Sequence, residues 1–270
     1  MPRKPRFNLP GIPQHVIQRG NNREPCFFTK ADYQRYLDDL SESATRFSCQ
    51  LHAYVLMSNH VHLLVSSDQA YGISQMMQAL GRRYVCYINR LYSRTGTLWE
   101  GRFKASLVDS ENYLLTCMRY IEMNVVRAKM VDHPAEYRWS SYAANAQGQQ
   151  DPIVTPHPSY LALGRSADKR QKAYRELFRQ PVENQPLHEI RQALNGELVL
   201  GCSYFKDRIQ DLTDRQARTG KPGRPRLKDM RGDALQRMFT GTSNIRKYCS
   251  LTPINDVVYD RLPVFTVKSE

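Results

Sequence analysis

Apolar residues recur along the first hundred residues with two different periods. Where they alternate with polar residues they indicate β-strands, and where they return every three or four positions they indicate amphipathic helices. Thr29 and Asp32 have the spacing of a helix capping box, and Ser58 with Asn59 forms a turn between two β-rich runs. The pattern predicts strands at residues 14–18, 51–57, 60–65 and 98–108 and helices at residues 30–47 and 73–91.

The order of these elements is β-α-β-β-α-β, followed by a helix that begins after Ser110 and runs to about residue 131. This order is typical of a ferredoxin-like, RRM-type fold. We therefore expect an α+β protein with an antiparallel sheet and helices on one face, which leaves the other face for a site. A helical C-terminal extension is predicted after it.

The sequence changes character at about residue 150. Residues 151–158 contain prolines and polar residues typical of a linker, and residues 215–232 form a basic, breaker-rich stretch that we expect to be a flexible arm. We expect one domain over residues 1–150 and a mostly helical extension over residues 151–270. The helices of the extension are predicted at residues 169–178, 187–194 and 203–211.

The net charge of the chain limits the classes of binding partner that we expect. The chain has 39 Lys and Arg against 26 Asp and Glu, a net charge of +13, which favours a polyanionic partner such as nucleic acid or an anionic membrane surface. The membrane is disfavoured, because no apolar run approaches the ~20 residues of a spanning helix. None of the six cysteines forms a C-x-x-C pair, and no secretory signal is visible at the start, so we expect a reduced, cytoplasmic protein.

His60 and His62 are the first candidates for chemistry. Side chains alternate along a strand, so these two imidazoles lie side by side on one face, where they can share a metal ion. Taken alone, a His-x-His pattern is more often a pair of surface or core histidines with hydrogen bonds to the backbone than a metal site.

The helix predicted after Ser110 offers a third metal ligand. Tyr113, Cys117, Tyr120 and Asn124 fall on one helical face, although a helix that simply packs its tyrosines remains open. Two imidazoles and the Asn124 amide oxygen make a reasonable three-ligand set. Such mixed nitrogen and oxygen ligation accepts Mg²⁺ or Mn²⁺ and also holds Zn²⁺ or Ni²⁺ in vitro.

Several separated segments resemble one family. Residues 57–64, Met-Ser-Asn-His-Val-His-Leu-Leu, resemble the HUH motif of single-tyrosine transposases, and residues 119–128, Arg-Tyr-Ile-Glu-Met-Asn-Val-Val-Arg-Ala, are similar to their tyrosine helix. Val125 stands where the family usually has proline, which we expect to affect helix geometry more than chemistry. The resemblance is to the REP-associated tyrosine transposases of bacteria and covers about residues 6–145. Further similar segments lie at residues 15–22, 98–103, 139–142, 200–205 and 223–226.

The resemblance implies an activity for residues 1–150. In this family a tyrosine hydroxyl attacks single-stranded DNA and forms a 5′-phosphotyrosine intermediate, and Tyr120 occupies the position of that nucleophile. Tyr113, seven residues earlier, is the alternative nucleophile. His60, His62 and Asn124 would hold Mg²⁺ or Mn²⁺, and His15 would support the site or simply pack.

The implied partner is single-stranded or hairpin DNA, bound by a monomer or a homodimer. The cations that we expect to contact phosphates, each of which is also readily explained as a solvated charge, are Arg19, Arg82, Arg83, Arg102, Lys104, Arg224 and Arg226. Two other functions stay open: a nucleic-acid-binding module of the same fold that has lost its chemistry, and an HUH nickase acting in replication initiation.

Overall fold

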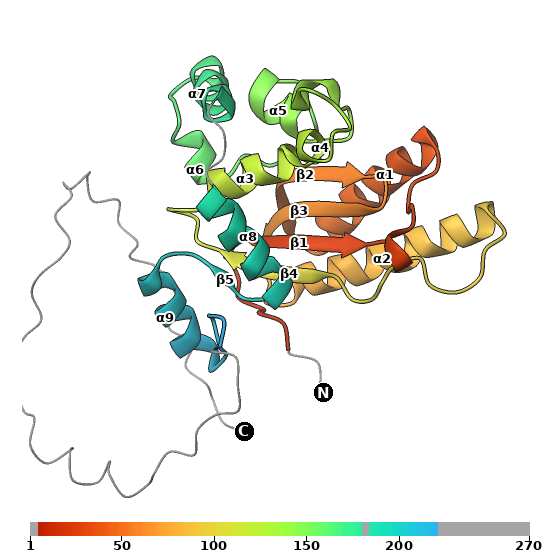
Figure 1. Cartoon of the computed structure of the whole chain (residues 1–270), viewed down its shortest axis with the longest axis horizontal. Coiled ribbons are helices and arrows are strands. Elements are labelled where there is room, and N and C mark those ends of the chain that lie inside the picture. Colours follow the sequence, from red (N-terminus) through yellow and green to blue (C-terminus); the bar gives the residue numbers. More distant parts are fainter. Residues whose placement is uncertain (1–4, 180–183, 221–270) are drawn as a thin grey trace, which may run out of the picture. The chain divides into compact units, whose positions relative to one another are not determined.

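The computed structural model describes residues 5–179 and 184–220, and its centre is a five-stranded sheet (Figure 1). The strand order is β2-β3-β1-β4-β5. Four strands pair antiparallel and β5 joins β4 in parallel, so the α+β class is confirmed and the sheet is mixed. The strands are β1 (Gln14–Arg19), β2 (Cys49–Met57), β3 (His60–Ser67), β4 (Lys104–Val108) and β5 (Val199–Leu200).

Two long helices cover one face of the sheet. These are α1 (Lys30–Arg46) and α2 (Gly72–Leu91), which pack against each other as well as on the strands. Asp32 accepts a hydrogen bond from the Thr29 N–H at 2.8 Å, so the predicted capping box begins α1. Leu40, Leu80 and Leu63 belong to the apolar core between the helices and the sheet.

The opposite face is partly covered, which differs from the expectation of an open face. α3 (Leu114–Glu122) packs on β2 and β3, and α8 (Asn184–Gly196) packs on β4, because each of these helices has an apolar side of its own to bury. The remaining helices are α4 (Asn124–Arg127), α5 (Tyr142–Gln147), α6 (Pro158–Leu161), α7 (Ala167–Arg179) and α9 (Ser203–Thr213), with 3₁₀ turns at Asn21–Arg23 and Pro134–Glu136.

The predicted helix over residues 110–131 is broken at Met123. The Asn124 Nδ2 donates to the carbonyl oxygens of Tyr120 and Ile121, both at 3.2 Å, and Arg127 donates to the same Tyr120 oxygen at 2.7 Å. These side chains occupy the acceptors that a continuous helix would use for its own backbone. The break therefore follows from Asn124 and Arg127, without the proline that the family usually has at position 125.

The extension packs on the first 150 residues. Tyr174 of α7 and Ile190 of α8 lie in the same apolar core as Met118 of α3, and the Thr155 N–H donates to the Leu51 carbonyl of β2. The domain boundary at residue 150 stays a prediction, and most of the basic arm lies outside the described residues. No helix among the described residues is long and apolar enough to cross a membrane.

Candidate active site

β3 places His60 and His62 on the sheet face that α3 covers, as the alternation predicts. Val61, between them, points into the core under α1 and α2. The two imidazole rings have their centroids 5.1 Å apart. His62 is almost fully buried and His60 is half-buried, so the pair lies at the edge of the covered region with one ring open to solvent.

The Nδ1 atom of each imidazole has a hydrogen-bond partner. His62 Nδ1 lies 2.8 Å from His15 Nε2, and His60 Nδ1 lies 2.6 Å from the Asn59 Oδ1. Since the amide oxygen only accepts, His60 carries its proton on Nδ1 and leaves the Nε2 lone pair unprotonated. His62 has the same tautomer when the His15 Nε2 accepts a hydrogen bond from the His62 Nδ1. Histidines that bind metals have this arrangement, in which the second ring nitrogen donates to an acceptor that fixes the ring.

α3 brings Tyr120 to the histidines. Its ring centroid lies 6.1 Å from that of His62 and 5.7 Å from that of His15, both edge to face. For the Tyr120 hydroxyl the structure describes no hydrogen bond to any of the described residues. The phenol is therefore held beside the imidazole pair by packing, and within the described part of the chain its oxygen has no hydrogen-bond partner.

Tyr113, the alternative nucleophile, has a different environment. Its hydroxyl donates to the Glu189 carboxylate of α8 at 2.8 Å, at the other end of α3. Burial, followed by this carboxylate, raises the pKa of Tyr113 to about 12. Tyr113 is thus bonded to the extension, while Tyr120 lies by the histidines.

Arg127 lies over Tyr120 and is the principal site residue to which the sequence reasoning gave no role. Its guanidinium carbon is 4.1 Å from the centroid of the Tyr120 ring, and its Nη2 donates to the Asn124 Oδ1 at 2.7 Å. The spacing of seven residues between Tyr120 and Arg127 is two helical turns, which is the signal that would have indicated their proximity. The site therefore contains a cation in addition to its imidazoles.

All three histidines of the site are held neutral. Burial, then the charge of Arg127, lowers the pKa of His15 to about 3, and burial, then Arg19, lowers the pKa of His60 to about 4. Burial also lowers the pKa of His62 well below its usual value, with His15 and His60 as the next causes. A neutral imidazole is the form that binds a metal ion.

The ligand types of the predicted set, two imidazoles and an amide oxygen, are ones that a divalent ion accepts together. Among the described residues no group of three or more His, Cys, Asp or Glu side chains is arranged to hold a metal, so the predicted site depends on a ligand of another type. The Asn124 amide oxygen is that type, and it has a second lone pair besides the one that accepts from Arg127. Two imidazoles with one amide oxygen leave coordination positions for phosphate oxygen or water.

The cations predicted to bind DNA divide between the two faces. Arg19 and Lys104 lie on the same face of the sheet as the histidines. Arg19 pairs in register with His60. Lys104 pairs with Ile17, which in turn pairs with His62. Arg82 and Arg102 line a pocket beside α2, on the other face. Arg83 forms ion pairs with Asp39 and Glu42, which makes it a poorer candidate for a phosphate contact, and Arg224 and Arg226 lie outside the described residues.

Glu122, two residues after Tyr120, points away from the site, as its helical position predicts. Its carboxylate is fully buried and accepts hydrogen bonds from Ser141 Oγ at 2.6 Å, Asn145 Nδ2 at 2.9 Å and the Tyr174 hydroxyl at 2.8 Å. Burial, partly opposed by these hydrogen bonds, raises the pKa of Glu122 to about 7. The carboxylate thereby ties the tyrosine helix to α5 and α7.

Comparison with known proteins gives one family. No curated protein sequence matches the chain. A structure of the REP-associated tyrosine transposase bound to a REP hairpin is similar over 58% of this chain and 93% of its own, with 14% identity and a TM-score of 0.47. A putative transposase from Deinococcus radiodurans is similar over 44% of this chain and 95% of its own, with 22% identity and a TM-score of 0.33. Residues 9–124, which carry the histidines, Tyr120 and Asn124, match the family model of the IS200-like transposases.

Proposed function

We propose that the protein is a metal-dependent DNA strand transferase of the REP-associated branch, which cleaves and rejoins single-stranded DNA beside hairpins through Tyr120. One observation carries the proposal: the Tyr120 ring lies 6.1 Å from that of His62, and its hydroxyl is uncommitted among the described residues. Tyr113 is the other tyrosine of this helix, and it is bonded to Glu189.

The chemistry is an exchange of phosphodiester bonds. The Tyr120 oxygen bonds to phosphorus, the phenol proton leaves to solvent, and the 3′ oxygen departs and takes up a proton as a hydroxyl. One phosphodiester is replaced by another, so the reaction needs no ATP and a 3′-hydroxyl can reverse it. A phenol is a weak nucleophile at neutral pH, so the reaction needs groups that activate the phosphate for attack.

Each site residue has a role in this exchange. A bound Mg²⁺ or Mn²⁺ would neutralise charge on the scissile phosphate. His60, His62 and Asn124 would hold the ion, while His15 and Asn59 orient the two imidazoles. Arg127, over the ring of Tyr120, would hold that ring in place and supply positive charge beside the phosphate that Tyr120 attacks.

The test is formation of a covalent protein–DNA adduct. Wild-type protein with Mn²⁺ and a DNA hairpin taken from the flanks of its own gene should give an adduct on a denaturing gel. Tyr120→Phe should abolish the adduct, and Tyr113→Phe, the matched control on the same helix, should leave it. EDTA and His60→Ala should each reduce it by at least about a hundredfold, the size of effect expected when transition-state charge stabilisation is removed.

The alternatives give different results in the same assay. An adduct that survives in Tyr120→Phe would show that Tyr120 is not the nucleophile. Activity that EDTA leaves unchanged would show that the reaction does not use a metal ion. Tight binding of hairpins without any adduct would favour the binding module. An adduct that never transfers its strand to an added 3′-hydroxyl would favour a nickase.

A further inference from the structure

Helix α7 of the extension contacts the turn of α3 that carries Tyr120. Arg119 and Glu122 are three residues apart, so they share one side of α3, and Tyr120 lies on a different side. The Glu122 carboxylate accepts a hydrogen bond from the Tyr174 hydroxyl at 2.8 Å. The guanidinium carbon of Arg119 lies 5.9 Å from the centre of the Phe178 ring. Two residues of α7, one helical turn apart, therefore hold the residues on either side of Tyr120 in the sequence.

The Glu122 carboxylate also joins this turn to the sheet. Ser141 Oγ donates to Glu122 and accepts from the backbone N–H of Tyr54 at 2.9 Å. Asn145 Nδ2 donates to Glu122 and to the carbonyl oxygen of His52, at 2.9 and 3.1 Å. Both backbone groups belong to β2, which pairs with β3, the strand of the predicted metal ligands. A continuous set of buried hydrogen bonds thus runs from α7 through the carboxylate to the strand beside the histidines.

A second bond between the tyrosine helix and the extension lies farther from the site. The Tyr113 hydroxyl donates to the Glu189 carboxylate of α8, also at 2.8 Å, but both side chains are half-buried. Tyr113 precedes Tyr120 by seven residues, which is two helical turns. This bond fixes the start of the helix and does not reach the turn that carries Tyr120.

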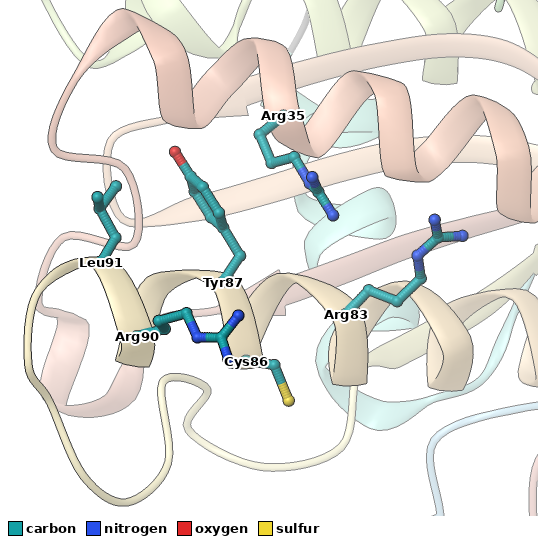
Figure 2. Close-up of a pocket in the computed structure, with 6 residues that line it drawn as sticks. All are labelled: Arg35, Arg83, Cys86, Tyr87, Arg90 and Leu91. Carbon is teal, nitrogen blue, oxygen red and sulfur yellow. The ribbon is translucent and has the colours of Figure 1, made fainter.

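The two long helices on the opposite face are linked in another way. α1 and α2 border a surface cavity lined by Arg35 and Arg83 (Figure 2), and Arg83 of α2 forms ion pairs with Asp39 and Glu42 of α1. The Arg83 and Glu42 side chains are exposed to water, which screens their attraction. The hydrogen bonds of Glu122 lie in the core, where water does not compete for them. They hold their geometry more firmly than the surface ion pairs do.

We infer that Glu122 is a positioning residue for Tyr120, and that α7 acts on the reaction through the bond between the Tyr174 hydroxyl and Glu122. The inference deepens the proposed function and rests on it. In-line attack needs the phenol oxygen aligned with phosphorus, and a displacement of about 1 Å can cost about a hundredfold in rate. The extension thereby sets the position of the nucleophile relative to the histidines.

The test compares two variants that each remove one tyrosine hydroxyl from a bond between the tyrosine helix and the extension. Tyr174→Phe removes the bond to Glu122, and Tyr113→Phe, the matched control, removes the bond to Glu189. The probe is the DNA hairpin of the adduct assay with Mn²⁺, used at saturating concentration in single-turnover reactions, with rates expressed per folded molecule. Affinity for the same hairpin is measured with Tyr120→Phe added to each variant, so that no cleavage occurs.

Tyr174→Phe should slow adduct formation at saturating DNA by on the order of tenfold and leave hairpin affinity unchanged, because the phenol is displaced while the DNA contacts remain. Tyr113→Phe should change neither. Glu122→Ala should slow the reaction by on the order of a hundredfold, and adding Tyr174→Phe to it should slow it no further, since the two side chains act through one bond. Glu122→Gln, whose amide can bond to all three partners, should recover most of the rate. If Glu122→Ala does not fold, the two tyrosine variants decide alone.

Amide hydrogen exchange gives a measurement that does not depend on activity. Residues 119–122 should exchange several-fold faster in Tyr174→Phe than in wild type, because the turn loses the bond that holds it to α7. In Tyr113→Phe only the start of the helix should exchange faster.

These outcomes separate the inference from the proposed function. If wild type forms the adduct and Tyr174→Phe reacts at the same rate, or if Tyr113→Phe loses as much rate as Tyr174→Phe, only the positioning role fails. A loss of hairpin affinity that accounts for the whole slower rate would also overturn it. If wild type never forms an adduct, the strand-transferase proposal fails. Faster exchange of residues 119–122 in Tyr174→Phe alone would then still support the hold of α7 on this turn, and unchanged exchange would overturn both.

Discussion

The two faces of the sheet are built from different kinds of side chain. Under α1 and α2 most of the buried groups are apolar or aromatic, with Leu40, Leu63 and Leu80 completely enclosed, and the fully buried carboxylate of Asp32 accepts hydrogen bonds from tyrosine hydroxyls and from the backbone at the start of α1. Under α3 the buried groups include His15, His62 and a fully buried carboxyl, Glu122. Burial of apolar surface stabilises the first face directly, whereas buried polar groups on the second face cost free energy unless each one finds a partner. The first face fixes the sheet, and the second uses that rigidity to hold polar groups in fixed geometry.

The largest effect that tests this contrast is loss of stability on the apolar face. Leu80 is fully buried between α2 and the sheet, so Leu80→Ala removes apolar contacts and leaves a cavity. The free energy of unfolding in urea should fall by about 2–5 kcal/mol. Adduct formation per folded molecule should not change, because Leu80 lies on the opposite face from Tyr120. A lower rate per folded molecule would show that the two faces are coupled.

The next effect concerns the carboxyl under α3. Because burial raises the pKa of Glu122 to about 7, the native protein binds a proton there that the unfolded chain, with a pKa of 4.5, releases. This stabilisation is full below pH 4.5 and is lost as the pH rises through 7. His15 and His60 have the opposite sign: their native pKa values are about 3 and about 4, so they lower stability as the pH falls below 6.5.

Glu122→Gln separates the two contributions. The variant keeps the shape and loses the titration, and the histidines are the same in both proteins. The free energy of unfolding of wild type minus that of the variant should therefore fall by about 2–3 kcal/mol between pH 4.5 and 7.5. Urea unfolding of metal-free protein across this range measures it. A difference that is constant with pH would mean that Glu122 titrates alike in the folded and unfolded states.

The third effect is on metal affinity. His15 orients His62 through the 2.8 Å contact between their ring nitrogens, so His15→Leu should weaken Mn²⁺ binding by about 10- to 100-fold in calorimetry. His15→Gln, which keeps an acceptor at this position, should recover part of the affinity. His52→Leu is the matched control, because His52 is a buried imidazole that contacts Ser66 and Thr155 instead. If His52→Leu weakens Mn²⁺ binding equally, the effect is general destabilisation.

The fold was predictable from the sequence where burial decides it. The periods of apolar residues predicted β1 to β3, α1 and α2 closely, because each of these elements buries one side against the same sheet. β5 was missed, since two residues that pair with β4 from almost a hundred positions away leave no local pattern. The break at Met123 was missed because side chains that compete for backbone acceptors decide it, and apolar periodicity does not record them.

The candidate site divides in the same way. Strand alternation placed His60 and His62 correctly on one face, because a strand has only two faces. The contact of His15 with His62, the stacking of Arg127 on Tyr120 and the ion pairs of Arg83 all depend on which segments the fold brings together. The roles assigned to Tyr120 and Asn124 stay predictions until the adduct and metal experiments are done.

The smallest effect distinguishes Tyr120 of α3 from Tyr113, the residue just before this helix. Tyr113→Phe removes the hydrogen bond to Glu189 and should lower the free energy of unfolding by about 1 kcal/mol, without changing adduct formation. Tyr120→Phe removes a hydroxyl that bonds to none of the described residues, so it should leave stability within about 0.5 kcal/mol of wild type while it abolishes the adduct. Urea unfolding and the gel assay are applied to both variants. We expect Tyr113→Phe to lower stability and keep the adduct, and Tyr120→Phe to keep stability and lose the adduct. If Tyr120→Phe destabilised the protein more than Tyr113→Phe, the Tyr120 hydroxyl would have a structural partner, and its loss of activity would no longer identify it as the nucleophile.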